Sequence, residues 1–87
     1  MENYDIYYTN KNLCYWLVLD NDYIRIIKED IINRKTPIYH IYSKHSETKI
    51  AEIKWYGAWR KYCLFPSSDT IWDKKCLNEI VKFLDNL

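Results

Sequence analysis

Two histidines and three cysteines are the side chains in this sequence that most readily act as nucleophiles or metal ligands. A thiolate beside an imidazole is a nucleophile, and the same two groups bind zinc. His40 and His45 lie far along the chain from Cys63 and Cys76, and none of them has the close paired spacing of structural zinc sites. A Cys–His pair is recognised only by its three-dimensional geometry. The sequence therefore predicts no catalytic residue, no metal site and no cofactor.

Carboxylates form two further candidate pairs for acid–base chemistry. Glu47 lies in a predicted turn and Glu52 in the strand that follows it, and Asp69 and Asp73 precede the predicted C-terminal helix. An aspartate placed like Asp73 caps a helix by accepting hydrogen bonds from its free backbone N–H groups. We therefore interpret these acids as a helix cap and surface charges, and we expect the protein not to be an enzyme.

The most distinctive segment is residues 53–66, in which five aromatic residues and three cations surround the chain's single glycine. Two alternating runs meet at Gly57-Ala58. Glycine adopts the positive φ of a two-residue hairpin turn without a Cβ clash. The pattern therefore predicts a β-hairpin with its turn at Gly57-Ala58.

This hairpin has three interpretations. Its rings could stack on the bases of single-stranded nucleic acid while Arg and Lys contact phosphates. The same residue types supply most protein-interface hot spots. In the third interpretation, Trp55 and Trp59 pack beneath the helix against Phe83 and Leu84, because a small domain needs its large side chains for the core. The candidate binding residues, for protein or nucleic acid, are Lys54, Tyr56, Arg60, Lys61, Tyr62, Tyr39 and Tyr42.

Charge and tyrosine content distinguish the two binding interpretations. The net charge is only +1, whereas a dedicated nucleic-acid binder is usually more basic. Nine tyrosines are too many for one small core, so several of them must reach the surface. An exposed aromatic surface and free sheet edges also permit a homodimer.

The segments around the hairpin read mainly as strands. Alternating or β-branched runs predict strands at 5–9, 13–19, 23–27, 38–43 and 48–56, with a return strand at 59–65. Polar turns are expected at 10–12, 20–22 and 44–47. Residues 28–34 form either one or two helical turns or an irregular continuation of the strand.

The C-terminal segment has the periodicity of an amphipathic helix. Apolar residues recur at intervals of three and four at Cys76, Leu77, Ile80, Val81, Leu84 and Leu87. We predict an α+β fold, with an antiparallel sheet of five to six strands and this C-terminal helix packed on one face. The 87 residues form a single domain, 1–87.

Composition places the protein in a cytoplasm. The longest apolar run, 13–19, is far shorter than the roughly 20 residues of a membrane span, and the N-terminus lacks the features of a signal peptide. Three widely spaced cysteines argue against a disulfide framework. We expect free thiols and no membrane partner.

The C-terminal part resembles small proteins of tailed phages and prophages. The resemblance depends on the pattern Ile53-Lys54-Trp55-Tyr56, Trp59 to Pro66, Thr70-Ile71-Trp72 and Cys76-Leu77 with Ile80 and Phe83-Leu84. It covers roughly residues 34–87 and leaves the strands of 1–33 unmatched. Such proteins often have Leu-Gly where this chain has Ile50-Ala51.

The resemblance implies a function in the cytoplasm of a host cell. It suggests a phage-encoded accessory protein that acts by stoichiometric binding to a host defence protein or complex, as anti-CRISPR proteins do. The alternative is a small single-stranded nucleic-acid-binding protein that uses the same aromatic and basic hairpin.

Overall fold

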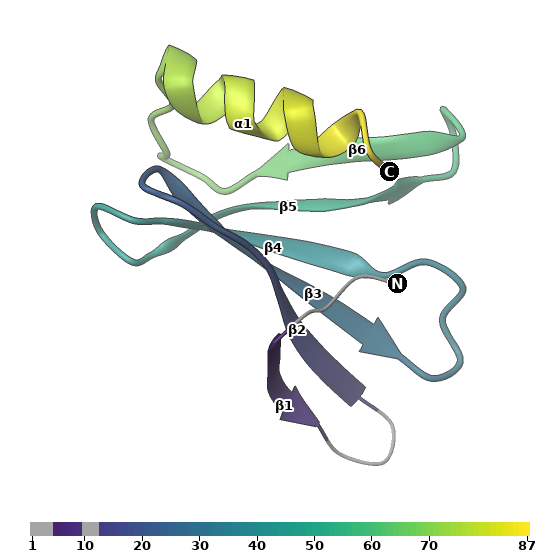
Figure 1. The fold of residues 1–87 in the computed structure, drawn as a ribbon. Coiled ribbons are helices and arrows are strands. Elements are labelled where there is room, and N and C mark those ends of the chain that lie inside the picture. Colours follow the sequence, from purple (N-terminus) through teal and green to yellow (C-terminus); the bar gives the residue numbers. More distant parts are fainter. Residues whose placement is uncertain (1–4, 10–12) are drawn as a thin grey trace.

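The computed structural model describes residues 5–9 and 13–87, which form one antiparallel sheet followed by a helix (Figure 1). The six strands are neighbours in the order of the chain, with β1 and β6 at the two edges. The elements are β1 Asp5–Thr9, β2 Leu13–Asp20, β3 Ile24–Ile31, β4 Ile38–Ser43, β5 Lys49–Tyr56, β6 Lys61–Pro66 and α1 Lys74–Leu84.

The predicted α+β class, with its antiparallel sheet and single C-terminal helix, is confirmed. The strand pattern also settles the open choice at residues 28–34, because β3 continues to Ile31 before the chain turns. The predicted turn at residues 10–12 lies outside the described residues. Within the described ranges, no helix is long and apolar enough to cross a membrane.

The core lies on one face of β3, β4 and β5, where buried side chains alternate except at Ile50 and Ala51, beside a shift in the β4–β5 register. The register places Ile26 opposite Ile41, and Ile41 opposite Ala51, so that these side chains share a face across three strands. The buried core residues are Ile24, Ile26, Tyr39, Ile41, Ile50, Ala51, Ile53 and Ile80.

Helix α1 begins at a cap that the sequence predicts. The Asp73 carboxylate accepts a hydrogen bond from the Cys76 backbone N–H at 2.9 Å, which satisfies one of the free donors of the first turn. Ile80 is buried in the core, and the Phe83 ring meets the Tyr39 ring edge-on at 5.0 Å between centroids. These contacts join α1 to β4.

Part of the predicted apolar stripe of the helix is exposed. Leu77 and Val81 are 45% and 55% exposed, whereas Cys76, Phe83 and Leu84 pack against the core. Successive helical residues are about 100° apart around the axis. Because Ile80 points into the core, Leu77 and Val81 lie together on one flank of the helix. The sequence pattern therefore overestimates the width of the buried stripe.

Asn21 connects the β2–β3 turn to the helix. Its side-chain oxygen accepts hydrogen bonds from the backbone N–H groups of Tyr23 and Ile24, at 2.9 and 3.0 Å, as in an Asx turn. Its amide nitrogen donates to the Glu79 carboxylate of α1. A single polar side chain thus fixes the turn and holds one flank of α1 against it.

The β5–β6 turn differs from the predicted two-residue turn. Residues 57–60 form a four-residue loop, in which Trp59 N–H donates to the Tyr56 carbonyl at 3.1 Å and Arg60 N–H donates to the Gly57 carbonyl at 3.3 Å. Arg60, with φ of 54°, adopts the left-handed conformation, and Gly57 does not. Glycine is therefore not required at position 57, and the strained position is occupied by a cation.

Candidate functional site

The end of the β5–β6 hairpin presents a group of exposed aromatic and basic side chains. We call Trp55, Tyr56, Trp59, Arg60 and Lys61 the hairpin tip. Trp59 is 66% exposed, Trp55 43% and Tyr56 38%. The expectation that Trp59 packs beneath the helix is therefore wrong, because Trp59 lies in the loop beyond the region that α1 buries. Trp55 lies in β5 beside Tyr62 and lines a groove with Leu84, so it is covered only in part.

Aromatic contacts hold the exposed rings in place. The Tyr56 ring meets the Trp59 ring at 5.2 Å and 82°, and the Phe65 ring at 6.0 Å and 74°. On the other face of the hairpin, the Trp55 ring meets the Tyr62 ring at 5.5 Å and 82°. Edge-to-face pairs of this kind are favourable beyond the area they bury. The tip therefore displays large rings in a fixed geometry.

The cations of the hairpin fall into two groups. The Lys54 ammonium lies 3.5 Å from a Glu52 carboxylate oxygen and 4.7 Å from the centre of the Phe65 ring, so its charge is already engaged. Arg60 and Lys61 are exposed, and neither forms an ion pair in the described part of the chain. The charges available for a partner at the tip are those of Arg60 and Lys61.

A groove of about 400 Å³ separates the tip from the end of α1. Trp55 and Tyr62 line it from the hairpin, Leu84 and Leu87 line it from the C-terminal segment, and Arg60 and Lys61 supply its polar edge. An apolar floor with a few convergent polar groups is typical of binding sites. The groove can accept an apolar side chain that is flanked by negative charge.

The seven candidate binding residues do not form one surface. Tyr56, Arg60 and Lys61 belong to the tip, Lys54 lies two residues before Tyr56 in β5, and Tyr62 is half-buried beside Trp55. Tyr39 is 7% exposed and belongs to the core. Tyr42 pairs with Lys49 at the opposite end of β5, about 23 Å from Tyr56 at the rise of a strand. Neither Tyr39 nor Tyr42 can share a contact surface with the tip.

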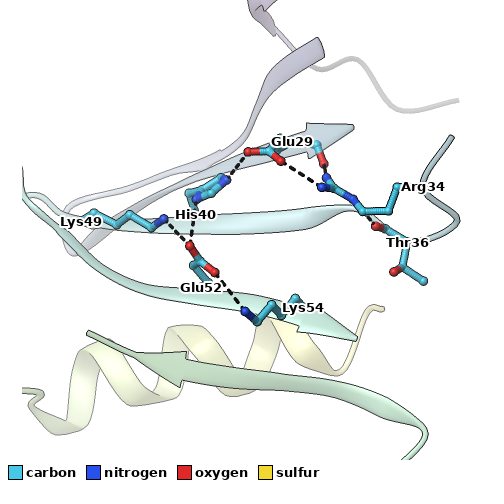
Figure 2. Close-up of polar contacts among 7 residues, drawn as sticks. All are labelled: Glu29, Arg34, Thr36, His40, Lys49, Glu52 and Lys54. Carbon is cyan, nitrogen blue, oxygen red and sulfur yellow. Dashed lines mark hydrogen bonds and ion pairs between the residues drawn. The ribbon is translucent and has the colours of Figure 1, made fainter. Parts of the chain in front are cut away.

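A second polar cluster crosses β3, β4 and β5 on the face opposite the core (Figure 2). His40 Nε2 lies 2.9 Å from Glu29 Oε1, and His40 Nδ1 lies 3.8 Å from Glu52 Oε2. Cations flank both carboxylates: Arg34 pairs with Glu29, and Lys49 and Lys54 pair with Glu52. We call these six residues the polar ladder. Each carboxylate has at least one cation beside it, and the contacts link three strands.

The carboxylates of the polar ladder remain ionised to lower pH than ordinary glutamates. Burial, the largest single influence, raises the pKa of Glu29, but the hydrogen bonds and charge interactions with His40 and Arg34 together lower it by more, and the pKa lies below its ordinary value. For Glu52, the hydrogen bond from Lys49 is the largest influence; burial opposes it, and the pKa is again lowered. Arg34 also donates to the Glu29 and Thr36 carbonyls, which orders the β3–β4 loop.

One Cys–His combination considered from the sequence, His45 with Cys76, lines a common pocket in the structure. A pocket of about 370 Å³ is lined by His45 and Cys76 among other residues. Burial, followed by the hydrogen bond with Asp73, raises the pKa of the Cys76 thiol, which keeps it protonated and a weak nucleophile. Across residues 5–9 and 13–87, no three His, Cys, Asp or Glu side chains are arranged to hold a metal ion.

Sequence reasoning missed the polar ladder because its members are far apart in the chain. Glu29, His40 and Glu52 become neighbours only through the register of three strands. The alternation within β5 indicates that Glu52 faces away from the core, but β4 has aromatic or apolar residues on both faces, and alternation alone does not align one strand with the next. A titratable residue in each of three consecutive strands was the available signal.

The fold and the hairpin tip define a small α+β protein with an exposed aromatic and basic loop. The chain is similar to a protein of Acholeplasma phage L2, described as an uncharacterized 9.3 kDa protein, with 29% identity over 70 residues, 80% of this chain and 90% of the phage protein. A match of 70 residues is longer than the segment 34–87, so it includes part of the N-terminal strands too. No protein-family profile and no solved structure matches the chain.

Proposed function

We propose that this is a phage-encoded accessory protein that acts by binding a protein partner stoichiometrically through the hairpin tip. The observation that carries the proposal is the exposure of Trp59 at 66%, held against Tyr56 and adjacent to the unpaired Arg60. A solvent-exposed tryptophan has no role in core stability. Exposing the apolar surface of its ring to water is unfavourable, and this cost is offset when a partner covers the ring.

The composition of the tip suits a protein interface. Trp, Tyr and Arg account for most interface hot spots, and all three types lie within residues 55–61. The edge-to-face contacts reduce the freedom of the rings before binding, so less conformational entropy is lost on association. The groove beside Leu84 extends this surface with an apolar hollow.

The proposal includes a specific class of target. Similarity to a phage protein supports a viral origin, and small phage proteins that bind without catalysis are typically directed at host machinery. We therefore propose that the partner is a host defence complex in the cytoplasm, such as a CRISPR-Cas complex, and that binding inhibits it. The proposed arrangement has α1 covering one face of the sheet, which leaves the tip free for the target.

Single-stranded nucleic acid is the second candidate ligand. Arg60 and Lys61 are unpaired beside three exposed rings, and a stacking platform with nearby cations binds single strands without sequence preference. Arg60 and Lys61 are the two cations at the tip that form no ion pair within the described residues, and so small a number argues against nucleic-acid binding, because affinity for a strand grows with the number of phosphates neutralised. We therefore rank protein binding first.

A phage-plating assay tests the anti-defence proposal. The protein is expressed in a host that carries an active defence system and in an isogenic host without it, and a phage that the system restricts is plated on both. We expect a higher plating efficiency only in the defended host, and loss of the effect in Trp59→Ala. Unchanged plating across hosts carrying different defence systems would contradict the anti-defence role.

A further inference from the structure

Strand β6 is an open edge of the sheet. Among residues 5–9 and 13–87 it pairs with β5 alone, and it is the last strand in the order of the sheet. Ser67 N–H donates to the Ile50 carbonyl at 2.8 Å, so Ser67 and Ile50 form a hydrogen-bonded pair. In an antiparallel ladder such pairs alternate with pairs that are not hydrogen-bonded. By this alternation, Cys63 and Phe65 hydrogen-bond to β5, whereas the backbone groups of Tyr62 and Leu64 point away from it.

The centre of this edge lacks the usual protection against pairing. Natural edge strands are commonly blocked by charged residues, prolines or bulges. In β6, the charge is at Lys61 and the proline is at Pro66, which are its first and last residues. The four residues between them, 62–65, are uncharged, and the β5–β6 register runs without a bulge. An unblocked, regular edge of this kind is a template for another strand.

One flank of α1 extends the apolar surface above the same edge. Leu84 lines the groove with Tyr62 of β6, and Leu77 lies seven residues earlier on the same side of the helix. Leu77 and Val81 are 45% and 55% exposed, while Glu79 on the opposite flank is tied to Asn21. The exposed apolar flank therefore faces the β6 side.

We propose that a second copy of this chain occupies the β6 edge and forms a two-fold symmetric dimer with a continuous sheet. In a register centred on Cys63, Tyr62 of each copy exchanges backbone hydrogen bonds with Leu64 of the other, so every outward group of these two residues is satisfied. The axis is perpendicular to the sheet, which places both α1 helices on the same face. Their exposed flanks then approach each other.

Charge supports self-pairing. Arg60 and Lys61 lie at one end of the edge, and Asp69 follows the other end; none of them forms an ion pair in the described part of the chain. Lys75, near that second end, lies over the Tyr23 ring on the far side of the helix. An antiparallel two-fold arrangement brings the basic end of one edge toward Asp69 of the other. Such an interface is self-complementary.

Sedimentation equilibrium of the full chain tests the dimer. We expect a monomer–dimer equilibrium in the wild type. Cys63→Glu faces Lys54 within its own sheet but opposes a second glutamate across the two-fold axis, and we expect dimerisation to weaken at least tenfold. Cys63→Ser is the matched control and should dimerise like the wild type. A wild type that stays monomeric, or a Cys63→Glu variant that dimerises normally, overturns the proposal.

Crosslinking tests the register. Residues directly opposite in a non-hydrogen-bonded antiparallel pair have Cα atoms about 4.5 Å apart, within the range of a disulfide. In a Cys14→Ser/Cys76→Ser background, mild oxidation should convert the dimer to a Cys63-linked species on a non-reducing gel. The Cys63→Ser chain, which retains Cys76, should not form it. A dimer that resists crosslinking at Cys63 contradicts this edge. The crosslinking is measured on the isolated protein without any target, so its result does not test target binding.

Discussion

Tyr56 and Trp59 form an edge-to-face ring pair, with centroids 5.2 Å apart, across the turn that begins the β5–β6 loop. The turn's hydrogen bond from Trp59 N–H to the Tyr56 carbonyl, at 3.1 Å, joins the same two residues. Backbone and side chains therefore fix Trp59 together while leaving 66% of it exposed. This is the structural basis of the proposed binding function.

Trp59→Ala should remove partner binding without unfolding the protein. An interface hot spot contributes about 2 kcal/mol or more, which corresponds to a loss of affinity of about 30-fold. Because Trp59 is exposed, the free energy of unfolding should fall by less than about 1 kcal/mol, most of it from the lost ring pair. Thermal unfolding and partner capture measure the two effects. If Trp59→Ala captures the partner as well as the wild type does, Trp59 is not part of the binding surface.

Arg60→Gly should stabilise the fold while weakening binding. The left-handed conformation costs an L-residue roughly 1–2 kcal/mol, which glycine avoids at a smaller entropic cost. We expect the free energy of unfolding to rise by about 0.5–1 kcal/mol in denaturant melts, and partner capture to decline because a cation is lost. A lower free energy of unfolding in Arg60→Gly would show that its side-chain contacts outweigh the strain.

Gly57→Ala is predicted to be tolerated. Gly57 does not adopt a positive φ, and an added Cβ would meet no atom within 4 Å. The substitution reduces the freedom of the unfolded chain, so the free energy of unfolding should be unchanged or higher by up to about 1 kcal/mol. A loss of more than about 1 kcal/mol in the same melts would contradict the loop conformation.

The polar ladder should make stability fall in acid. The pKa of Glu29 is lower in the folded chain than in the unfolded chain, so its contribution is present above the unfolded value of about 4.3 and is lost as pH falls through the folded pKa. Denaturant melts across this range should show a declining free energy of unfolding in the wild type. Glu29→Gln should be less stable at neutral pH, on the order of 1 kcal/mol.

The pH dependence of Glu29→Gln is the informative comparison. Glutamine does not ionise, so this variant should show a shallower decline in acid than the wild type. Glu47→Gln is the matched control, because Glu47 is exposed and lies outside the ladder. Identical acid profiles for the wild type and Glu29→Gln would contradict the role of the His40 and Arg34 contacts.

Core and exposed apolar residues should respond very differently to truncation. Ile53 is fully buried in the core, between Tyr39 of β4 and Leu64 of β6, so Ile53→Ala should lower the free energy of unfolding by about 2–5 kcal/mol. Val81→Ala shortens a side chain that is 55% exposed, and it should change the free energy of unfolding by less than about 0.5 kcal/mol. Similar losses in both variants would mean that the exposed flank of α1 is covered in the monomer.

Local patterns predicted most of the fold. Alternation in Ala51 and Ile53 identified the core face of β5, and Asp73 was correctly placed as the helix cap. Both signals depend on residues within a few positions of one another. Residues 28–34 were ambiguous because Ile31 and Ile32 are surrounded by charged residues with no clear period, and the pairing of Ile31 with Leu13 of β2 decides in favour of a strand through Ile31.

The candidate site was less predictable because it depends on loop conformation and register. A glycine next to alanine suggested a two-residue turn, but the loop is longer and bends at Arg60. That difference moves Trp59 away from α1 and into solvent. Tyr39 could not be assigned to the core from its own strand, since both faces of β4 contain aromatic or apolar residues. Only the pairing with Ile53 reveals its face.

The most direct test of protein binding is to capture tagged protein from an infected or phage-sensitive host, with and without nuclease, and to determine the mass of the intact complex. We predict a host protein or complex bound in a fixed whole-number ratio that survives nuclease treatment, and that is absent when Trp59→Ala is the bait. Recovery of nucleic acid alone, lost with nuclease or salt, would contradict it and favour a single-strand binder.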